Sequence, residues 1–458
     1  MARTRHRSVK KQISPQHKKK QSRGRAVSRH IRSEESRLTR NQGTNMKTQQ
    51  PKNTSRRDFL SVGLVLAGAS LAPWSLRAAP AGQPFRIGAL NSITGVGGPY
   101  GVPMLEAIRL AVDEVNAAGG AAGRQLQLFA EDDQTKPDAA VLAAKKLIEV
   151  NQVQAVVGIW PSSVGLAVMP ITNNAGLIMM NTCGAPEMLT ENRKGLAWMF
   201  QASNAVFGRA FAEVARQRGF KRPAVMAFNN STFVGLANYF KETWEKDGGK
   251  VSSMVIYEPN QTTYRTELNR VLATKPDVIA MGSYRPDATI LLREWYQTGQ
   301  DCKFIMPGWT ANEALVKALG KEVTEGIISI SNVAASGNPA YKSFSERFRA
   351  KVKHDPDVFA AQSYDMVIAL ALAIEAAGPT ADIAAINGQV KAVTRHGGEK
   401  ISSFAQGRDL IRAGKAVDYD GASSNLEFGA HGETVPDFGV SEIENGKLVL
   451  KETVPGTR

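Results

Sequence analysis

The sequence predicts an α/β protein with two lobes, each built on a doubly wound parallel sheet. Short apolar runs alternate with amphipathic helical patterns from residue 85 onward, and the same alternation restarts after about residue 204. The chain of 458 residues is also long enough for two domains. Strict alternation of strand and helix implies right-handed crossovers, and therefore parallel sheets covered by helices on both faces.

The first lobe is expected to carry four strands with helices between them. The strands should cover residues 85–90, 126–130, 154–160 and 177–180, and the helices residues 105–115, 137–148 and a stretch from 162 onward. Gly119 and Gly120 end the first helix, and Pro137 opens the second. The run from Gln154 to Trp160 is too short and too apolar for a solvated helix, so it should be a buried parallel strand.

The second lobe repeats the pattern. Helices are expected at 206–218, 233–246, 264–273 and 287–296, and strands at 224–228, 251–257, 278–281, 304–306 and 327–330. Beyond residue 333 the patterns are helical, at 341–354, 358–377 and 383–393, with no further sheet. The simplest chain path returns to cover the first lobe and then sends a strand-rich tail to the second. This path assigns residues 82–204 plus 333–418 to lobe I and residues 205–332 plus 419–458 to lobe II.

The net charge of +15 does not indicate a nucleic-acid partner, because the excess lies outside the predicted lobes. Residues 1–80 hold 19 of the 57 basic and 3 of the 42 acidic residues, which leaves 38 basic and 39 acidic residues in 81–458. Residues 1–45 are polar and basic without an apolar face, so we expect a disordered extension, upstream of a true start at Met46.

Residues 46–81 have the pattern of a twin-arginine export signal. Arg56 and Arg57 precede Phe-Leu, a moderately apolar core reaches Ala72, and small residues at 78–81 form a cleavage site. The core is shorter than the roughly 20 residues of a spanning helix, so we expect no membrane insertion. No cysteine stands at the cleavage site, which argues against a lipoprotein. The predicted location is the periplasm.

Cys183 and Cys302 are the only cysteines, and they lie far apart in the chain. We expect two free, buried thiols, although a disulfide between them stays open at this stage. Neither cysteine has the spacing of a metal ligand. No metal or cofactor is predicted.

Ser162 and Ser163 lie where a buried strand should turn into a helix. Backbone N–H groups, the helix dipole and a hydroxyl meet at such a junction, which suits a carboxylate, although Ser162 could instead only cap its helix. Ligands of open parallel sheets bind beyond the strands' carboxyl ends. Those ends are residues 91–94 (with Thr94), 160–163 and 182–184 in lobe I, and 229–233, 283–285 and 308–310 in lobe II.

Several motifs occur in the order of a known family. They are Ile87-Gly88, Thr94-Gly95, Asp113-Glu114-Val115-Asn116, Glu131-Asp132-Asp133, Val157-Gly158, Ser162-Ser163, Pro186-Glu187, Ser363-Tyr364-Asp365 and Glu444-Asn445-Gly446-Lys447. Over residues 84–452 the chain resembles the leucine/isoleucine/valine-binding protein family, which are type I periplasmic solute-binding proteins of ABC importers. The resemblance implies a hinge of three crossings, a ligand in the cleft between the lobes, and closure by hinge bending. It also implies an ABC permease as partner, and we expect a monomer.

The resemblance also implies ligand contacts. The carboxylate of an amino acid would be held by Ser162 and by Thr182 with Gly184. Because glycine lacks the hydroxyl often found at position 184, Ser163 or Thr182 would have to substitute. Tyr284 matches a tyrosine of the second lobe. A further aromatic position is matched by Thr232 or Phe233.

One position departs from the family pattern. A carboxylate that pairs with the ligand's ammonium is expected near residues 307–312, where this sequence has Trp309 and no acid. An unpaired buried ammonium would cost several kcal/mol. Either Glu313, Asp287 or Asp365 takes over, or the ligand has no ammonium. Aromatic residues at candidate wall positions make an aromatic or otherwise apolar carboxylate a serious competitor; they are Trp160, Phe233, Tyr284 and Trp309.

The predicted function is therefore binding without chemistry, of a branched-chain or hydrophobic amino acid or a related small carboxylate. Aromatic acids, short amides or urea in the same fold are the alternative ligands, and a receptor could replace the permease. An exported nicotinamide dehydrogenase is a weaker alternative. Its glycine cluster, residues 95–98, begins five residues after Leu90, where the tight turn of a dinucleotide site should already be complete.

Overall fold

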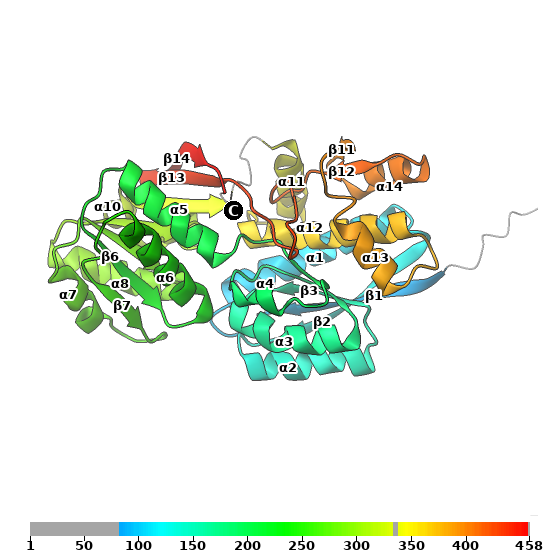
Figure 1. Cartoon of the computed structure of the whole chain (residues 1–458), viewed down its shortest axis with the longest axis horizontal. Coiled ribbons are helices and arrows are strands. Elements are labelled where there is room, and N and C mark those ends of the chain that lie inside the picture. The colour runs from blue at the N-terminus through cyan, green and yellow to red at the C-terminus, as the bar shows by residue number, and fades with distance from the viewer. Residues whose placement is uncertain (1–81, 333–337, 457–458) are drawn as a thin grey trace, which may run out of the picture. The chain divides into compact units, whose positions relative to one another are not determined.

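The computed structural model describes residues 82–332 and 338–456. These residues belong to one compact unit and carry two separate main sheets. The predicted fold class, two helix-covered parallel-sheet lobes, is confirmed (Figure 1). The basic extension and the export signal, expected at 1–45 and 46–81, lie outside the described residues.

Lobe I is built on a five-stranded parallel sheet in the order β2-β1-β3-β4-β5. Its strands are β1 (Gly82–Asn91), β2 (Arg124–Asp132), β3 (Ala155–Ile159), β4 (Ile178–Asn181) and β5 (Ala197–Met199). Strand β3 is buried along its whole length. Val157 packs with the hydrophobic cluster on one face and Val156 with that on the other, because successive side chains of a strand point to opposite faces. Two buried faces explain why this run is apolar throughout.

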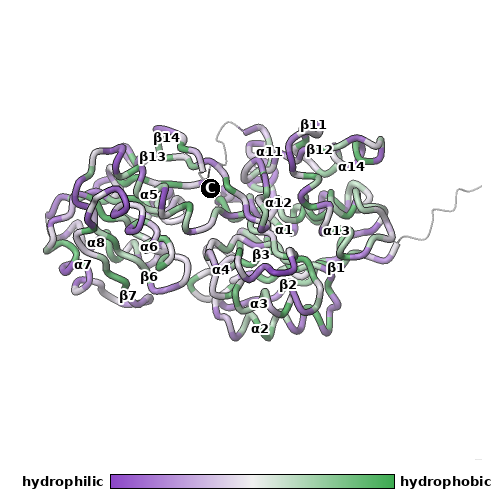
Figure 2. The backbone as a smooth tube through the Cα atoms, viewed as in Figure 1, coloured by the Kyte–Doolittle hydropathy of each residue, from purple (hydrophilic) through white to green (hydrophobic). Residues whose placement is uncertain are grey.

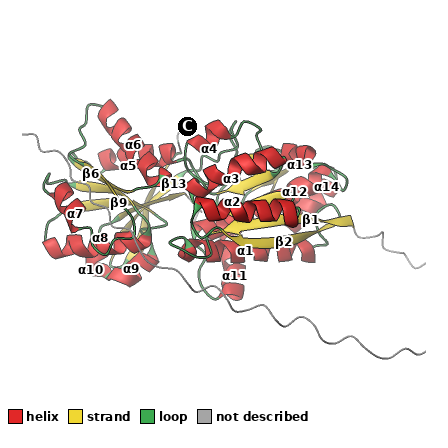
Figure 3. Cartoon of the chain, turned by 90° about the horizontal axis from the view of Figure 1, so that it is seen from below, coloured by secondary structure: helices red, strands yellow, loops and turns green. Residues whose placement is uncertain are grey.

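Helices cover both faces of the lobe I sheet (Figure 3). Helices α1 (Gly98–Ala117) and α12 (Val358–Ala377) lie on one face, and α2 (Pro137–Lys145), with a π-helical turn at Lys146–Val150, and α3 (Ser162–Ala175) on the other. Helix α12 is long and apolar enough to cross a membrane, but 94% of its most apolar window is buried inside the protein. It is therefore the core helix of lobe I. Figure 2 shows hydrophobic stretches inside each lobe and hydrophilic residues on the outer turns.

Lobe II has a seven-stranded sheet in the order β14-β13-β10-β9-β8-β6-β7. The strands are β6 (Pro223–Phe228), β7 (Met254–Tyr257), β8 (Val278–Gly282), β9 (Lys303–Pro307), β10 (Ile328–Asn332), β13 (Phe438–Glu444) and β14 (Lys447–Val454). The last two form an antiparallel hairpin on the edge of an otherwise parallel sheet. Its two-residue turn, Asn445-Gly446, has positive φ at both residues, as the tight hairpin turn requires.

Helices α5 (Asn204–Gln217) and α6 (Ser231–Lys246) pack together on one face of the lobe II sheet. The other face is covered by α7 (Arg265–Leu272), α8 (Arg285–Thr298), α9 (Glu313–Leu319) and α10 (Lys321–Thr324) (Figure 3). Helices α5, α6, α7 and α8 lie close to the positions expected from the sequence, whereas the short helices α9 and α10 were not predicted.

The expectation that no sheet follows residue 333 was wrong. Strands β11 (Glu399–Ile401) and β12 (Val417–Tyr419) form a two-stranded parallel sheet around helix α14 (Phe404–Arg412). The sequence gives little sign of β11, because its Glu399 and Lys400 are exposed and polar. The short elements α4 (Glu187–Glu191) and β5 were also missed, whereas α11 (Pro339–Val352) and α13 (Ile383–Val390) agree with the expected helices.

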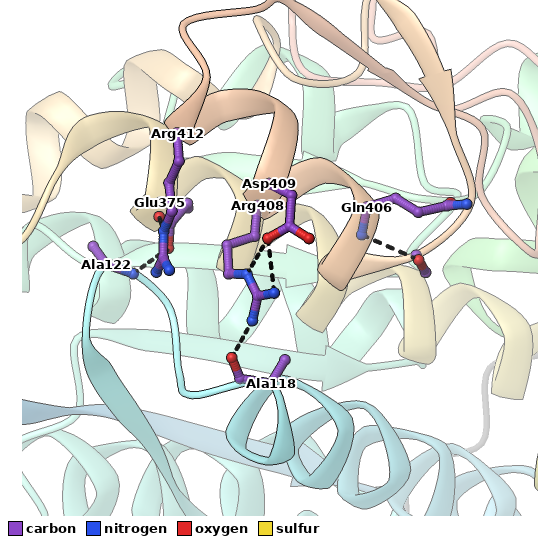
Figure 4. Close-up of polar contacts among 8 residues, drawn as sticks. Ala118, Ala122, Glu375, Gln406, Arg408, Asp409 and Arg412 are labelled. Carbon is purple, nitrogen blue, oxygen red and sulfur yellow. Dashed lines mark hydrogen bonds and ion pairs between the residues drawn. The ribbon is translucent and has the colours of Figure 1, made fainter.

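Helix α14 is fastened to lobe I by two arginines (Figure 4). Arg408 donates to the Ala118 carbonyl at the end of α1, and Arg412 Nε lies 2.7 Å from Glu375 Oε1. The backbone N–H of Ala122 donates to the other oxygen of Glu375 at 2.5 Å. Glu375 therefore ties α14, α12 and the turn before β2 together.

The chain passes between the lobes three times, close to the cavity that the next section describes. The first crossing lies between β5 and α5, the second between β10 and α11, and the third precedes β13. The return at residue 419 expected from the sequence comes later. Tyr419 and Phe428 are buried in the lobe I cluster, and Thr434 N still donates to the Met199 carbonyl of β5 at 3.0 Å. Buried apolar residues in 419–428 keep this stretch on lobe I.

Candidate functional site

A small cavity lies where the carboxyl ends of strands from both lobes face each other. Its volume is about 20 Å³, which is enough for about one water molecule. The lining residues come from the ends of β3, β4, β8 and β9, from the first crossing, and from the starts of α6 and α12. They are Trp160, Ser162, Thr182, Gly184, Gln201, Asn204, Thr232, Tyr284, Trp309 and Phe359.

Aromatic rings from the two lobes meet across this cavity. The centroid of Trp160 from lobe I lies 4.9 Å from that of Tyr284 from lobe II. Phe359 packs edge-on against Trp160 at 5.8 Å and lies 5.6 Å from Trp309. The rings fill the space between the lobes, so a ligand of amino-acid size can enter only if the lobes or the rings move apart.

Tyr100, on α1, extends the aromatic contact across the lobes. Its ring stacks on Trp160 at 4.8 Å with an interplanar angle of 25°. The backbone N–H of Arg285, in lobe II, donates to the Tyr100 hydroxyl at 3.3 Å, and the Arg285 guanidinium lies over the Tyr100 ring at 5.6 Å. Burial raises the pKa of Tyr100 to about 12. Tyr100 therefore contacts both lobes as a neutral phenol.

The hydroxyl of Ser162 is the polar centre of the lobe I side. It accepts hydrogen bonds from the backbone N–H groups of Gly184 and Ala185, both at 3.1 Å. The hydroxyl of Thr232, from lobe II, donates to the same oxygen at 3.1 Å. Ser162 is also the first residue of α3, whose first-turn N–H groups have no partner within the helix. Hydroxyl and helix terminus together suit a carboxylate oxygen.

Two further donors in the cavity wall are unsatisfied. Asn204 Nδ2 and Trp309 Nε1 are buried and have no hydrogen-bond partner among the described residues. An unpaired buried donor costs about 1–3 kcal/mol. Both groups would gain from a ligand that brings acceptor oxygens.

None of the three acids proposed as partners of a ligand ammonium lines the cavity. Asp287 accepts from the Tyr264 hydroxyl and, at 3.0 Å, from Asn260 N. Asp365 accepts from Tyr419, Ala422 and Ser423 inside lobe I. Glu313 borders a separate groove.

Six of the nine predicted ligand residues line the cavity: Trp160, Ser162, Thr182, Gly184, Tyr284 and Trp309. The other three lie elsewhere. Ser163 follows Ser162 on the helix, so its side chain is rotated away from the cavity. Thr94 is exposed and donates to Asp132 Oδ2 at 2.6 Å. Phe233 is fully buried behind Tyr284, 4.7 Å between centroids, and Thr232 takes the lining position instead.

Three lining residues were missed by the sequence reasoning. Gln201 and Asn204 follow β5, a three-residue strand too short to be recognised by periodicity. Phe359 starts α12, about 50 residues beyond the lobe II strand ends. Only the polar residues directly before α5 could have indicated that Gln201 and Asn204 line the cavity.

Cys183 and Cys302 are buried and unbridged, as predicted. Burial raises the pKa of both thiols, that of Cys302 to about 12. Among the described residues, no group of three or more His, Cys, Asp or Glu side chains could hold a metal ion.

Comparisons with known proteins agree with this architecture. A family model described as periplasmic binding protein matches residues 84–431. The leucine-, isoleucine-, valine-, threonine- and alanine-binding protein of Pseudomonas aeruginosa is 26% identical over 71% of this chain and 86% of its own length.

Two solved structures share the fold. The leucine-binding protein LivK of Thermotoga maritima has a TM-score of 0.70 and 22% identity, covering 81% of this chain and 98% of its own. A solute-binding protein of R. palustris in complex with benzoate has a TM-score of 0.69 and 19% identity, covering 81% and 97%. Because the family model spans most of the chain, the chain belongs to the periplasmic binding protein family.

Proposed function

We propose that this protein is the substrate-binding component of an ABC importer and binds a hydrophobic amino acid or a related small carboxylate between its lobes. The proposal rests on the cavity between the lobes. Residues from both lobes line it, and two of these residues, Asn204 and Trp309, each carry a buried donor (Nδ2 and Nε1) that has no hydrogen-bond partner among the described residues. The Pseudomonas aeruginosa relative is named as a binding protein for leucine, isoleucine, valine, threonine and alanine. That name supports this ligand class.

Binding would proceed without chemistry. Lobe I offers the Ser162 hydroxyl and the first turn of α3 to the carboxylate, while lobe II offers Tyr284 and Trp309 to the apolar body. A ligand stabilises the closed arrangement only to the extent that this arrangement gives it contacts which the open one lacks. Contacts from both lobes supply that difference, and hinge bending is the matching motion.

An aromatic carboxylate without an ammonium group is the second candidate ligand. The observation that favours it is the composition of the wall, which has four aromatic side chains and no acid. A zwitterion would leave its ammonium without an anionic partner there. The benzoate complex of the R. palustris protein shows that this fold accepts such a ligand.

The location and the partners are part of the same proposal. The twin-arginine pattern at residues 46–81 supports export to the periplasm, where a monomer would deliver its ligand to an ABC permease. A receptor is the alternative partner. Genes for permeases and ATPases next to the gene for this protein would favour transport, and a neighbouring gene for a kinase or chemoreceptor would favour sensing.

Titration calorimetry of the purified protein with leucine, isocaproate and benzoate tests the proposal. Isocaproate is leucine without its ammonium group, so the two compounds separate the main ligand class from the second. We expect saturable binding of at least one compound in a one-to-one ratio, with the compound recovered unchanged. Tighter binding of leucine supports an amino-acid ligand, and tighter binding of isocaproate or benzoate supports the ammonium-free one. Absence of binding by all three, or turnover of any, contradicts the proposal.

A further inference from the structure

Three buried amides join the cavity wall to the hinge. Gln201, on the first crossing, lines the cavity and is 4% exposed. Its Oε1 accepts a hydrogen bond from Asn332 Nδ2 at 3.0 Å and a second from Gln362 Nε2 at 2.7 Å. Asn332 is the last residue of β10 in lobe II, directly before the second crossing, and Gln362 lies in α12 of lobe I. One oxygen therefore gathers donors from both lobes.

These two bonds fix the orientation of the Gln201 carboxamide. A carbonyl oxygen has two lone pairs, and both are used here. The polar group of Gln201 that remains for the cavity is its N–H₂. We propose that Gln201 is a specificity-determining residue, which Asn332 and Gln362 hold as a hydrogen-bond donor toward an acceptor oxygen of the ligand. This inference rests on the proposed function, because it assigns one contact of the same ligand.

The opposite orientation of the three amides is less favourable. As the structure stands, Asn332 Oδ1 and Gln362 Oε1 are buried acceptors with no partner among the described residues. If all three amides were turned over, the N–H₂ groups of Asn332 and Gln362 would be the buried groups without a partner. Buried donors without acceptors are rarer in proteins than buried carbonyls without donors. The donor orientation of Gln201 is therefore the preferred one.

The arrangement also makes the donor depend on lobe closure. Gln201 keeps its hydrogen bonds to Asn332 and Gln362 only while the end of β10 and the start of α12 lie on either side of it. Hinge bending that moves Asn332 would release one anchor, and the carboxamide could then rotate. The contact to the ligand would be fixed only in the closed form, which is the condition under which a ligand favours closure.

The test compares a carboxylate with its amide. Benzoate and isocaproate present only acceptor oxygens, whereas benzamide and isocaproamide also present N–H donors. Gln201→Glu keeps the size of the side chain and its bonds to Asn332 and Gln362 but replaces the cavity-facing donor with an anionic acceptor. We expect the affinity for the carboxylates to fall by about a hundredfold and the affinity for the amides to fall much less. Gln217→Glu, at an exposed position of α5, makes the same charge change as a control and should leave all affinities unchanged.

A second variant tests the anchoring and does not depend on how Gln201→Glu folds. Gln362→Met removes one anchor with a side chain of similar size. We expect carboxylate affinity to fall by about tenfold. In a protein that already carries Gln201→Met, Gln362→Met should cause little further loss, because the donor that Gln362 holds is already absent. Thermal unfolding of each variant checks that the fold is retained.

The outcomes separate this inference from the proposed function. If the parent protein binds none of leucine, isocaproate and benzoate, the proposed function fails, and the inference fails with it. If the parent protein binds them, the inference alone is overturned by equal losses for carboxylate and amide, by a preference for carboxylates that survives Gln201→Glu, or by unchanged carboxylate affinity in Gln362→Met.

Discussion

The indole of Trp160 and the phenol of Tyr284, from opposite lobes, lie 4.9 Å apart, centroid to centroid. Each ring directly follows a buried strand, β3 in lobe I and β8 in lobe II. A ligand that enters the cavity must separate these rings or slide between them. Its binding should therefore change the surroundings of Trp160 directly.

We predict that ligand binding changes the intrinsic fluorescence of Trp160. The change follows because the ring exchanges its contacts with Tyr100 and Tyr284 for contacts with the ligand. Titration of benzoate into the parent protein and into Trp160→Phe measures it. Trp244→Phe is the matched control, because Trp244 stacks on Phe240 inside lobe II, outside the cavity. A fluorescence change that survives in Trp160→Phe and disappears in Trp244→Phe would contradict the prediction.

Ser162→Ala should weaken carboxylate binding by about 1–3 kcal/mol, because it removes a hydrogen-bond partner of a charged group. Titration calorimetry with isocaproate or leucine gives the change in Kd. Ser163→Ala makes the same chemical change one residue later, where the side chain does not line the cavity, and should leave Kd within a factor of about two. Equal effects of the two variants would remove Ser162 as the carboxylate contact.

Trp309→Ala should reduce the affinity for benzoate more than that for isocaproate. A flat aromatic ligand gains ring contacts worth about 0.5–1.5 kcal/mol beyond its buried area, and an aliphatic ligand does not. Trp309→Phe keeps an aromatic ring but removes the unpaired Nε1 donor. It should therefore lower the affinity for both compounds while leaving the ratio of the two affinities unchanged. Equal losses for the two ligands in Trp309→Ala would speak against an aromatic pocket.

The stability of the protein should depend on the ionisation of Asp357, the N-cap of α12. Burial raises the pKa of Asp357 from its usual value to about 6, although hydrogen bonds and Arg285 oppose the shift. The folded protein therefore binds this proton more tightly than the unfolded chain does. The resulting stability is complete below about pH 4 and is lost as the pH rises through about 6.

Asp357→Asn isolates this effect, because asparagine caps a helix about as well as aspartate. The parent protein should lose stability relative to the variant between pH 4 and pH 7, by about 1–3 kcal/mol. Melting temperatures of both proteins, measured across that range, give the difference. A difference that stays constant with pH would show that Asp357 does not titrate there.

Arg56→Lys combined with Arg57→Lys should block export, because the paired arginines are the recognised part of the proposed signal. Cell fractionation with an antibody against the protein measures the periplasmic share. Arg77→Lys, near the proposed cleavage site, is the control and should leave export intact. If the double variant were exported as well as the parent protein, export would not depend on the paired arginines, and the twin-arginine assignment would be wrong.

The sequence by itself determined most strands of the two main sheets, the longer helices that cover them, and the end of each sheet that borders the cavity. Apolar runs such as Ala155–Ile159 are local signals, and the carboxyl ends of parallel strands must lie at one edge of their sheet. Six of the predicted residues therefore meet around one cavity. The tertiary structure alone decided the rest. Gln201, Asn204 and Phe359 reach the cavity from other segments of the chain; Asp287 and Asp365 are held elsewhere by their own partners, and Glu313 borders a separate groove. Such contacts depend on the packing of whole lobes against each other, and no local pattern of residues encodes it.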